Sequence, residues 1–188
     1  MLICKRFDLD PRLCSVLGYV GLPALALALF SLPCPFPWRI HVCIAAQGMA
    51  SHDKRFKTLT YELHDSTPDL TQDILTDAGF VVLLKYVLRL RRTGMALLAP
   101  VCSSWRWLNR FTSGRSRDNW QGNTSVLSVR QGNLMVSRVV LLLWLLDAMG
   151  CVYVLEQPLG SILDAHARFQ EFLKTHVVWR VLHIKEYV

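Results

Sequence analysis

The sequence predicts an α/β protein in which helices cover both faces of a parallel sheet. One observation predicts this class, and a second bounds the size of the domain. Apolar strand-like runs and helix-like segments alternate along residues 38–188 in the order β, β, α, β, α, β, α, β. The chain has 188 residues, of which 52% are hydrophobic, and this is enough for one domain with a sizeable core.

The expected elements follow from local patterns. Short apolar runs bounded by small or turn-forming residues predict strands at 39–46, 57–63, 95–99, 151–155 and 177–184. Longer apolar segments predict helices at 80–92, 133–149 and 165–175, with Gly94 and Gly150 ending the first two. Residues 105–130 are rich in Arg, Ser, Asn and Gly, and they are expected to form a long loop.

Residues 1–37 differ from the rest of the chain. Residues 16–32 are almost wholly apolar and follow three basic residues, while Pro23 interrupts the run. One interpretation is an apolar N-terminal extension of a protein of the nucleus or cytoplasm. The other is a signal-like segment, which would make the chain secreted or anchored in a membrane through residues 16–32 alone. We expect the extension, with the domain beginning at residue 38.

The charge pattern indicates an anionic partner. The formal net charge is +7, and residues 85–117 hold eight basic residues, with no acidic residue between Asp77 and Asp118. A solvated helix face followed by a loop would give the same pattern. The six cysteines form no CxxC pair and have no His at ligand spacing, so the sequence predicts no metal site.

Polar side chains follow three of the expected strands. Glu62 ends one strand, Cys102 follows another, and Glu156 ends a third. Because the carboxyl ends of parallel strands meet at one edge of a sheet, we expect these residues to share that edge. Neighbouring cations would favour the thiolate of Cys102, although a free cysteine is often only a small buried apolar residue.

Two segments resemble a known family. Pro100-Val101-Cys102-Ser103-Ser104 resembles the Pro-Cys strand end of cytosine-5 DNA methyltransferases, and Glu156-Gln157-Pro158 resembles their Glu-Asn-Val segment. The likeness is closer to a divergent group from protist and mobile-element proteins and covers about residues 48–187. The matching positions are Cys102, Ser103, Ser104, Trp105, Asn109, Arg110, Thr112, Ser113, Gly114, Arg115 and Leu155 to Pro158.

The resemblance implies a Rossmann-like, partial methyltransferase fold that binds S-adenosylmethionine. Gly48 would face the methionine part of the cofactor and Glu62 would bind its ribose. Asp73 and Ile74 would flank its adenine, and Pro100 would complete the site.

The resemblance also implies a catalytic pair and a nucleic-acid surface. The Cys102 thiolate would add to ring carbon six of a cytosine, and Glu156 would protonate or hold ring nitrogen three. The phosphate contacts, with DNA favoured over RNA, would come from Arg106, Arg110, Arg115 and Arg117.

The sequence also departs from the family pattern. Its glycine loop keeps only Gly48, Val101 replaces a proline, and the family would continue beyond residue 188, so we expect a domain truncated at its C-terminus. These departures and the apolar run at residues 16–32 leave two alternatives open. One is a binding domain without turnover, and the other is a non-enzymatic membrane-anchored or secreted protein.

Overall fold

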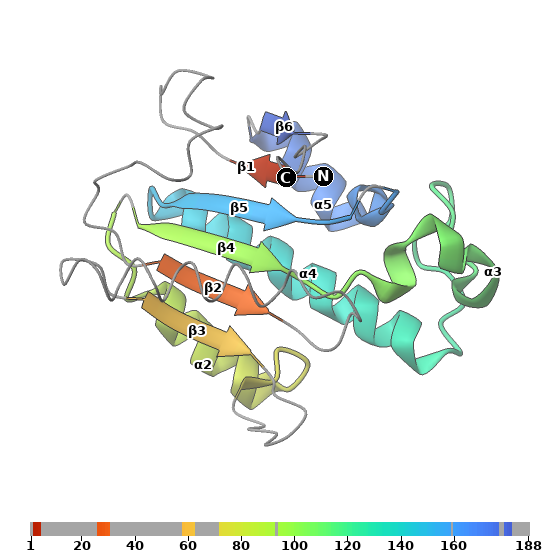
Figure 1. The fold of residues 1–188 in the computed structure, drawn as a ribbon, viewed down its shortest axis with the longest axis horizontal. Helices are drawn as coiled ribbons and strands as arrows, with labels where there is room; N and C mark the ends of the chain where they lie inside the picture. Colours follow the sequence, from red (N-terminus) through yellow and green to blue (C-terminus); the bar gives the residue numbers. More distant parts are fainter. Residues whose placement is uncertain are drawn as a thin grey trace, which may run out of the picture.

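The chain forms a mixed structure of helices and strands around a sheet with parallel pairing, which confirms the α/β class. The computed structural model describes residues 2–4, 26–30, 58–62, 72–92, 94–158, 160–176 and 179–181. The strands are β1 (Leu2–Cys4), β2 (Ala26–Phe30), β3 (Thr58–Glu62), β4 (Met95–Ala99), β5 (Val152–Glu156) and β6 (Trp179–Val181). Their order in the sheet is β3-β2-β4-β5-β1-β6 (Figure 1).

The neighbours β3, β2, β4 and β5 pair in parallel, and β1 runs antiparallel to both β5 and β6. Side chains alternate between the two faces along β4 and β5. Ala96 and Leu98 of β4 are buried on the same face as Tyr153 and Leu155 of β5. This face forms the floor of the hydrophobic core.

Three helices cover that face. They are α2 (Asp77–Val87), α4 (Leu127–Ala148) and α5 (Ala167–Thr175), and α4 packs between the other two. Figure 1 shows α2 and α4 behind the sheet. The ring of Phe172 in α5 lies 6.0 Å from that of Tyr153. These three helices therefore lie against one face of the sheet, and within the described ranges helices on both faces are not confirmed.

Helix α4 is the centre of the core. Its buried side chains include Val136, Val140 and Leu143, which recur at the spacing of one helical face. By length and composition, α4 is the single helix among the described residues that could cross a membrane. Half of its most apolar window is nevertheless buried inside the fold, as expected for a core helix.

Several predicted elements match the structure and others differ. The strands predicted at 95–99 and 151–155 are β4 and β5, to within one residue. Residues 105–130 are not an open loop, because they contain the 3₁₀ turn Trp107–Asn109, the helix α3 (Arg110–Ser113) and the first turn of α4. In this segment, most backbone N–H groups find acceptors close by in the sequence, while Trp105 and Trp120 join the hydrophobic core.

The N-terminal residues contribute backbone to the sheet. Strands β1 and β2 both lie within residues 1–37 and pair with strands of the rest of the chain. Residues 26–30 form a β-strand in the sheet, whereas a membrane anchor over residues 16–32 would require a helix there. The boundary at residue 37 stays a prediction, and the strand predicted at 39–46 lies outside the described residues.

Candidate functional site

The structure brings Cys102 and Glu156 to the same edge of the sheet. Strands β4 and β5 are parallel neighbours, Glu156 is the last residue of β5, and Cys102 comes three residues after the end of β4. Glu62 ends β3, which pairs in parallel with β2 and lies further along this edge. The expected shared edge is therefore observed for all three positions, with Glu62 placed by its backbone.

Gln157 joins the two strand ends. Its buried side chain donates from Nε2 to the Pro100 carbonyl (2.8 Å), and its Oε1 accepts a hydrogen bond from Ser161 Oγ (2.9 Å). Two backbone bonds extend the connection, from Ile162 N to the Trp105 carbonyl (2.9 Å) and from Trp107 N to the Gly160 carbonyl (3.1 Å). The segment that carries Cys102 and the segment that follows Glu156 thus form one unit.

Cys102 lies inside this unit. Its carbonyl accepts the backbone N–H groups of Trp105 (2.9 Å) and Arg106 (3.1 Å), and this starts the first 3₁₀ turn, Ser103–Trp105. The residue is only 7% exposed. Such burial is compatible with a small core residue and with a nucleophile that meets its substrate in a closed site.

Arg115 is the central residue of a buried polar cluster beneath the Cys102 segment. Its Nη1 donates to Asn133 Oδ1 (2.7 Å) and to the Trp120 carbonyl, and its Nη2 donates to the Val129 carbonyl (3.0 Å). The guanidinium also stacks on the ring of Trp105, with Cζ 3.6 Å from its centroid. Burial lowers the pKa of Arg115 to about 10, so it stays charged at neutral pH.

This placement differs from the phosphate contact that the family resemblance implied for Arg115. The residue is 2% exposed, and both Nη atoms donate to protein acceptors, so it cannot reach a phosphate at the surface. The structure corrects the predicted role to a structural one, in which Arg115 fixes the Cys102 segment on α4.

Gly132 allows the cluster to pack closely against α4. A Cβ at this position would lie 2.5 Å from Ser104 Oγ and 3.1 Å from Arg115 Nη2. A glycine within a helix costs about 1 kcal/mol relative to alanine, and here the close approach requires it. Sequence reasoning missed this residue, although a glycine inside an otherwise helical segment was the available signal.

His166 completes the cluster and was also missed. Its ring lies 4.4 Å from that of Trp120, and Nε2 is 3.3 Å from Ser137 Oγ. Burial, with smaller contributions from the charges of Arg168 and Arg115, lowers the pKa of His166 to about 4. His166 is therefore neutral at physiological pH, and no local sequence motif marks it.

The other three predicted phosphate-binding arginines are less buried than Arg115. The guanidinium of Arg110 lies over the ring of Trp107, with Cζ 4.2 Å from its centroid. Arg117 has a 65% exposed side chain and pairs with Asp164 at 3.4 Å. Arg106 is half-buried beside Cys102. These three arginines remain candidates for contact with an anionic partner.

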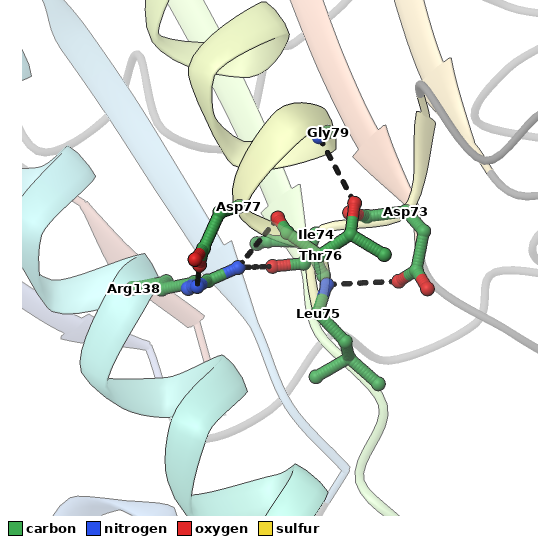
Figure 2. Close-up of polar contacts among 7 residues, drawn as sticks. All are labelled: Asp73, Ile74, Leu75, Thr76, Asp77, Gly79 and Arg138. Carbon is green, nitrogen blue, oxygen red and sulfur yellow. Dashed lines mark hydrogen bonds and ion pairs between the residues drawn. The ribbon is translucent and has the colours of Figure 1, made fainter.

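The predicted adenine-binding residues lie in the turn that precedes α2 (Figure 2). Asp73 Oδ1 accepts a hydrogen bond from Leu75 N at 2.8 Å, which fixes the carboxylate. Ile74 is buried, and its carbonyl accepts a hydrogen bond from Arg138 Nη1 at 2.7 Å.

Arg138 also binds the Thr76 carbonyl and the Asp77 carboxylate, so α4 holds this turn in place. Gly48 lies outside the described residues.

No protein-family model, curated protein or solved structure matches this chain. Among the described residues, no three His, Cys, Asp or Glu side chains gather in a way that could hold a metal ion.

Proposed function

We propose that this chain is a methyltransferase-like domain that binds S-adenosylmethionine and nucleic acid, acts on cytosine and has a partial Rossmann-like fold. The observation that carries the proposal is the connection through Gln157, because it joins the segments of Cys102 and Glu156 at the ends of adjacent parallel strands. Working groups of open parallel sheets gather at this edge. The resemblance of both segments to the two catalytic segments of cytosine-5 methyltransferases supports the same assignment.

The proposed chemistry requires one nucleophile and one acid. The Cys102 thiolate forms a bond to ring carbon six of cytosine, and Glu156 donates a proton or hydrogen bond at ring nitrogen three, which makes ring carbon five nucleophilic. When bound, S-adenosylmethionine would supply an electrophilic methyl group to ring carbon five and leave as S-adenosylhomocysteine. Water then takes the proton from ring carbon five, and the electrons of that bond expel the Cys102 thiolate and restore the ring. A base in a duplex must leave its stack to reach this site.

In the proposal, Asp73 would meet the adenine end of the cofactor. Asp73 Oδ1 is fixed by Leu75 N, and Oδ2 has no partner among the described residues, so it can accept a hydrogen bond from an amino group. Ile74 is buried beside Asp73, and the Pro100 carbonyl accepts a hydrogen bond from Gln157. In the proposal, Ile74 would flank the adenine and Pro100 would complete the site. In the proposal, Gly48 and Glu62 hold the methionine and ribose parts.

Trapping of a covalent adduct tests this function. The protein is incubated with S-adenosylmethionine and an oligonucleotide whose cytosine carries fluorine at ring carbon five. Because fluorine cannot leave as a cation, an adduct on Cys102 is expected in the wild type and absent in Cys102→Ser. Glu156→Gln should slow adduct formation by roughly two to four orders of magnitude.

Cys151→Ala is the matched control. Cys151 is buried like Cys102 but immediately precedes β5, at the opposite edge of the sheet, so its loss should leave trapping unchanged. Equilibrium binding of labelled S-adenosylmethionine is measured in parallel. Cofactor binding without an adduct would leave a binding domain that lacks turnover, and a protein that binds no cofactor would contradict the proposal.

A further inference from the structure

Exposed aromatic side chains gather directly after the Cys102 segment. Trp107 is 49% exposed, Leu108 75% and Phe111 85%, although large apolar side chains usually avoid water. These three residues and Arg110 occupy the second 3₁₀ turn and α3. We call these four residues the aromatic ridge.

The ridge is organised around a cation. Arg110 Cζ lies 4.2 Å from the ring centroid of Trp107 and 4.6 Å from that of Phe111, so one guanidinium contacts both rings. Asn109 Nδ2 donates to the Ser103 carbonyl at 2.5 Å, and the ridge is thereby fixed to the residue that follows Cys102. The rings are thus held in place before any partner binds.

We propose that the aromatic ridge is a stacking platform for unpaired bases of a single-stranded nucleic acid. The inference deepens and rests on the proposed function, because it names a strand with unpaired bases as the substrate of the same edge. Every base has a π-face, so exposed aromatic rings with an arginine among them can bind single strands without sequence specificity. The ridge is joined through Asn109 to Ser103, the residue that follows Cys102, so in this proposal a base next to the target cytosine would stack on it.

Charge complementarity favours a polyanion over other partners. The ridge belongs to the interval between Asp77 and Asp118, which contains no acidic residue, and the chain carries a net charge of +7. Arg117, on the following loop, has a 65% exposed side chain that can approach phosphates. An anionic membrane surface would also attract these charges, so the experiment includes vesicles as a competing partner.

Fluorescence anisotropy with a labelled single strand of about 12 nucleotides tests the proposal, because single-strand sites span roughly 4–16 nucleotides. The wild type should bind this strand more tightly than a duplex of the same sequence. Trp107→Ala and Phe111→Ala should each weaken binding about 5- to 100-fold. The slope of log affinity against log salt should stay unchanged in both variants, since the rings carry no charge.

Arg110→Lys separates stacking from a simple phosphate contact. Lysine keeps the charge but loses the planar group, so a stacking role predicts weaker binding with an unchanged salt slope. The matched control is Leu88→Ala, because Leu88 is an exposed apolar residue at the end of α2. This control should bind like the wild type. Circular dichroism confirms that each variant is folded.

Two results would overturn the inference. One is wild-type affinity for the single strand in both ring variants. The other is ring-dependent binding only to vesicles of phosphatidylserine and phosphatidylcholine, which would assign the ridge to a membrane. Binding of labelled S-adenosylmethionine, measured on the same protein, distinguishes a failure of the ridge proposal from a failure of the proposed function. If the strand binds through the rings but the cofactor does not bind, the stacking role of the ridge stands and the methyltransferase proposal is refuted. If the cofactor binds but strand binding does not depend on the rings, only the stacking role is refuted.

Discussion

Lowering the pH from about 6.5 to 4 is expected to destabilise the fold through His166. Burial holds its pKa at about 4 in the folded protein, against 6.5 for an ordinary histidine, so the unfolded chain binds more protons in this interval. The stability that neutral His166 provides is complete above pH 6.5 and is lost as the pH falls to about 4. At about 1.4 kcal/mol per pKa unit, the loss amounts to about 3 kcal/mol. The side chain is 1% exposed, so water screens this cost little.

Urea unfolding at several pH values between 7.5 and 4.5 measures the effect. His166→Phe keeps a ring against Trp120 and removes the titration, so its stability should fall less steeply in acid than that of the wild type. His176→Gln is the control, because His176 lies beside Asp147, outside the cluster, and its loss should leave the His166 contribution in place. Parallel acid slopes in wild type and His166→Phe would refute the reasoning.

Two further predictions concern packing beneath the site. Gly132→Ala should destabilise the protein by about 1–3 kcal/mol in urea unfolding, because its Cβ would meet Ser104 Oγ at 2.5 Å, whereas Ser128→Ala on the exposed side of α4 should change little. Gln157→Leu should cost about 1–3 kcal/mol by leaving the buried Pro100 carbonyl unpaired, and it should also reduce adduct formation at Cys102. Unchanged unfolding midpoints would contradict either prediction.

The sequence was sufficient to place β4 and β5 and the edge that their ends share. Both strands are mostly apolar runs of five residues that follow a glycine closely, and their short length and the flanking breakers favour a strand over a buried helix. The rule that parallel strands end at one edge then placed Cys102 and Glu156 together without any knowledge of side-chain contacts. Local pattern and topology were enough for these features.

The buried cluster could not be predicted in the same way. Arg115 and Arg110 have the same charge and similar neighbours in the sequence, yet one is buried and the other lies over exposed rings. The acceptors of Arg115 include Val129 and Asn133, which reach it only because α4 passes beneath the Cys102 segment. Burial of an arginine depends on such distant acceptors, and charge patterning does not contain this information.

The cluster connects the stability of the fold to the position of Cys102. Arg115 has lost its water, and the cost of that burial is offset only while its protein acceptors stay in place. One acceptor, Ser104 Oγ at 3.3 Å, lies two residues after Cys102, so a change at α4 reaches the proposed nucleophile through a single contact. A displacement of about 1 Å can cost roughly a hundredfold in rate when reacting groups must be oriented. Gly132→Ala should therefore lower adduct formation even under conditions where the variant remains fully folded.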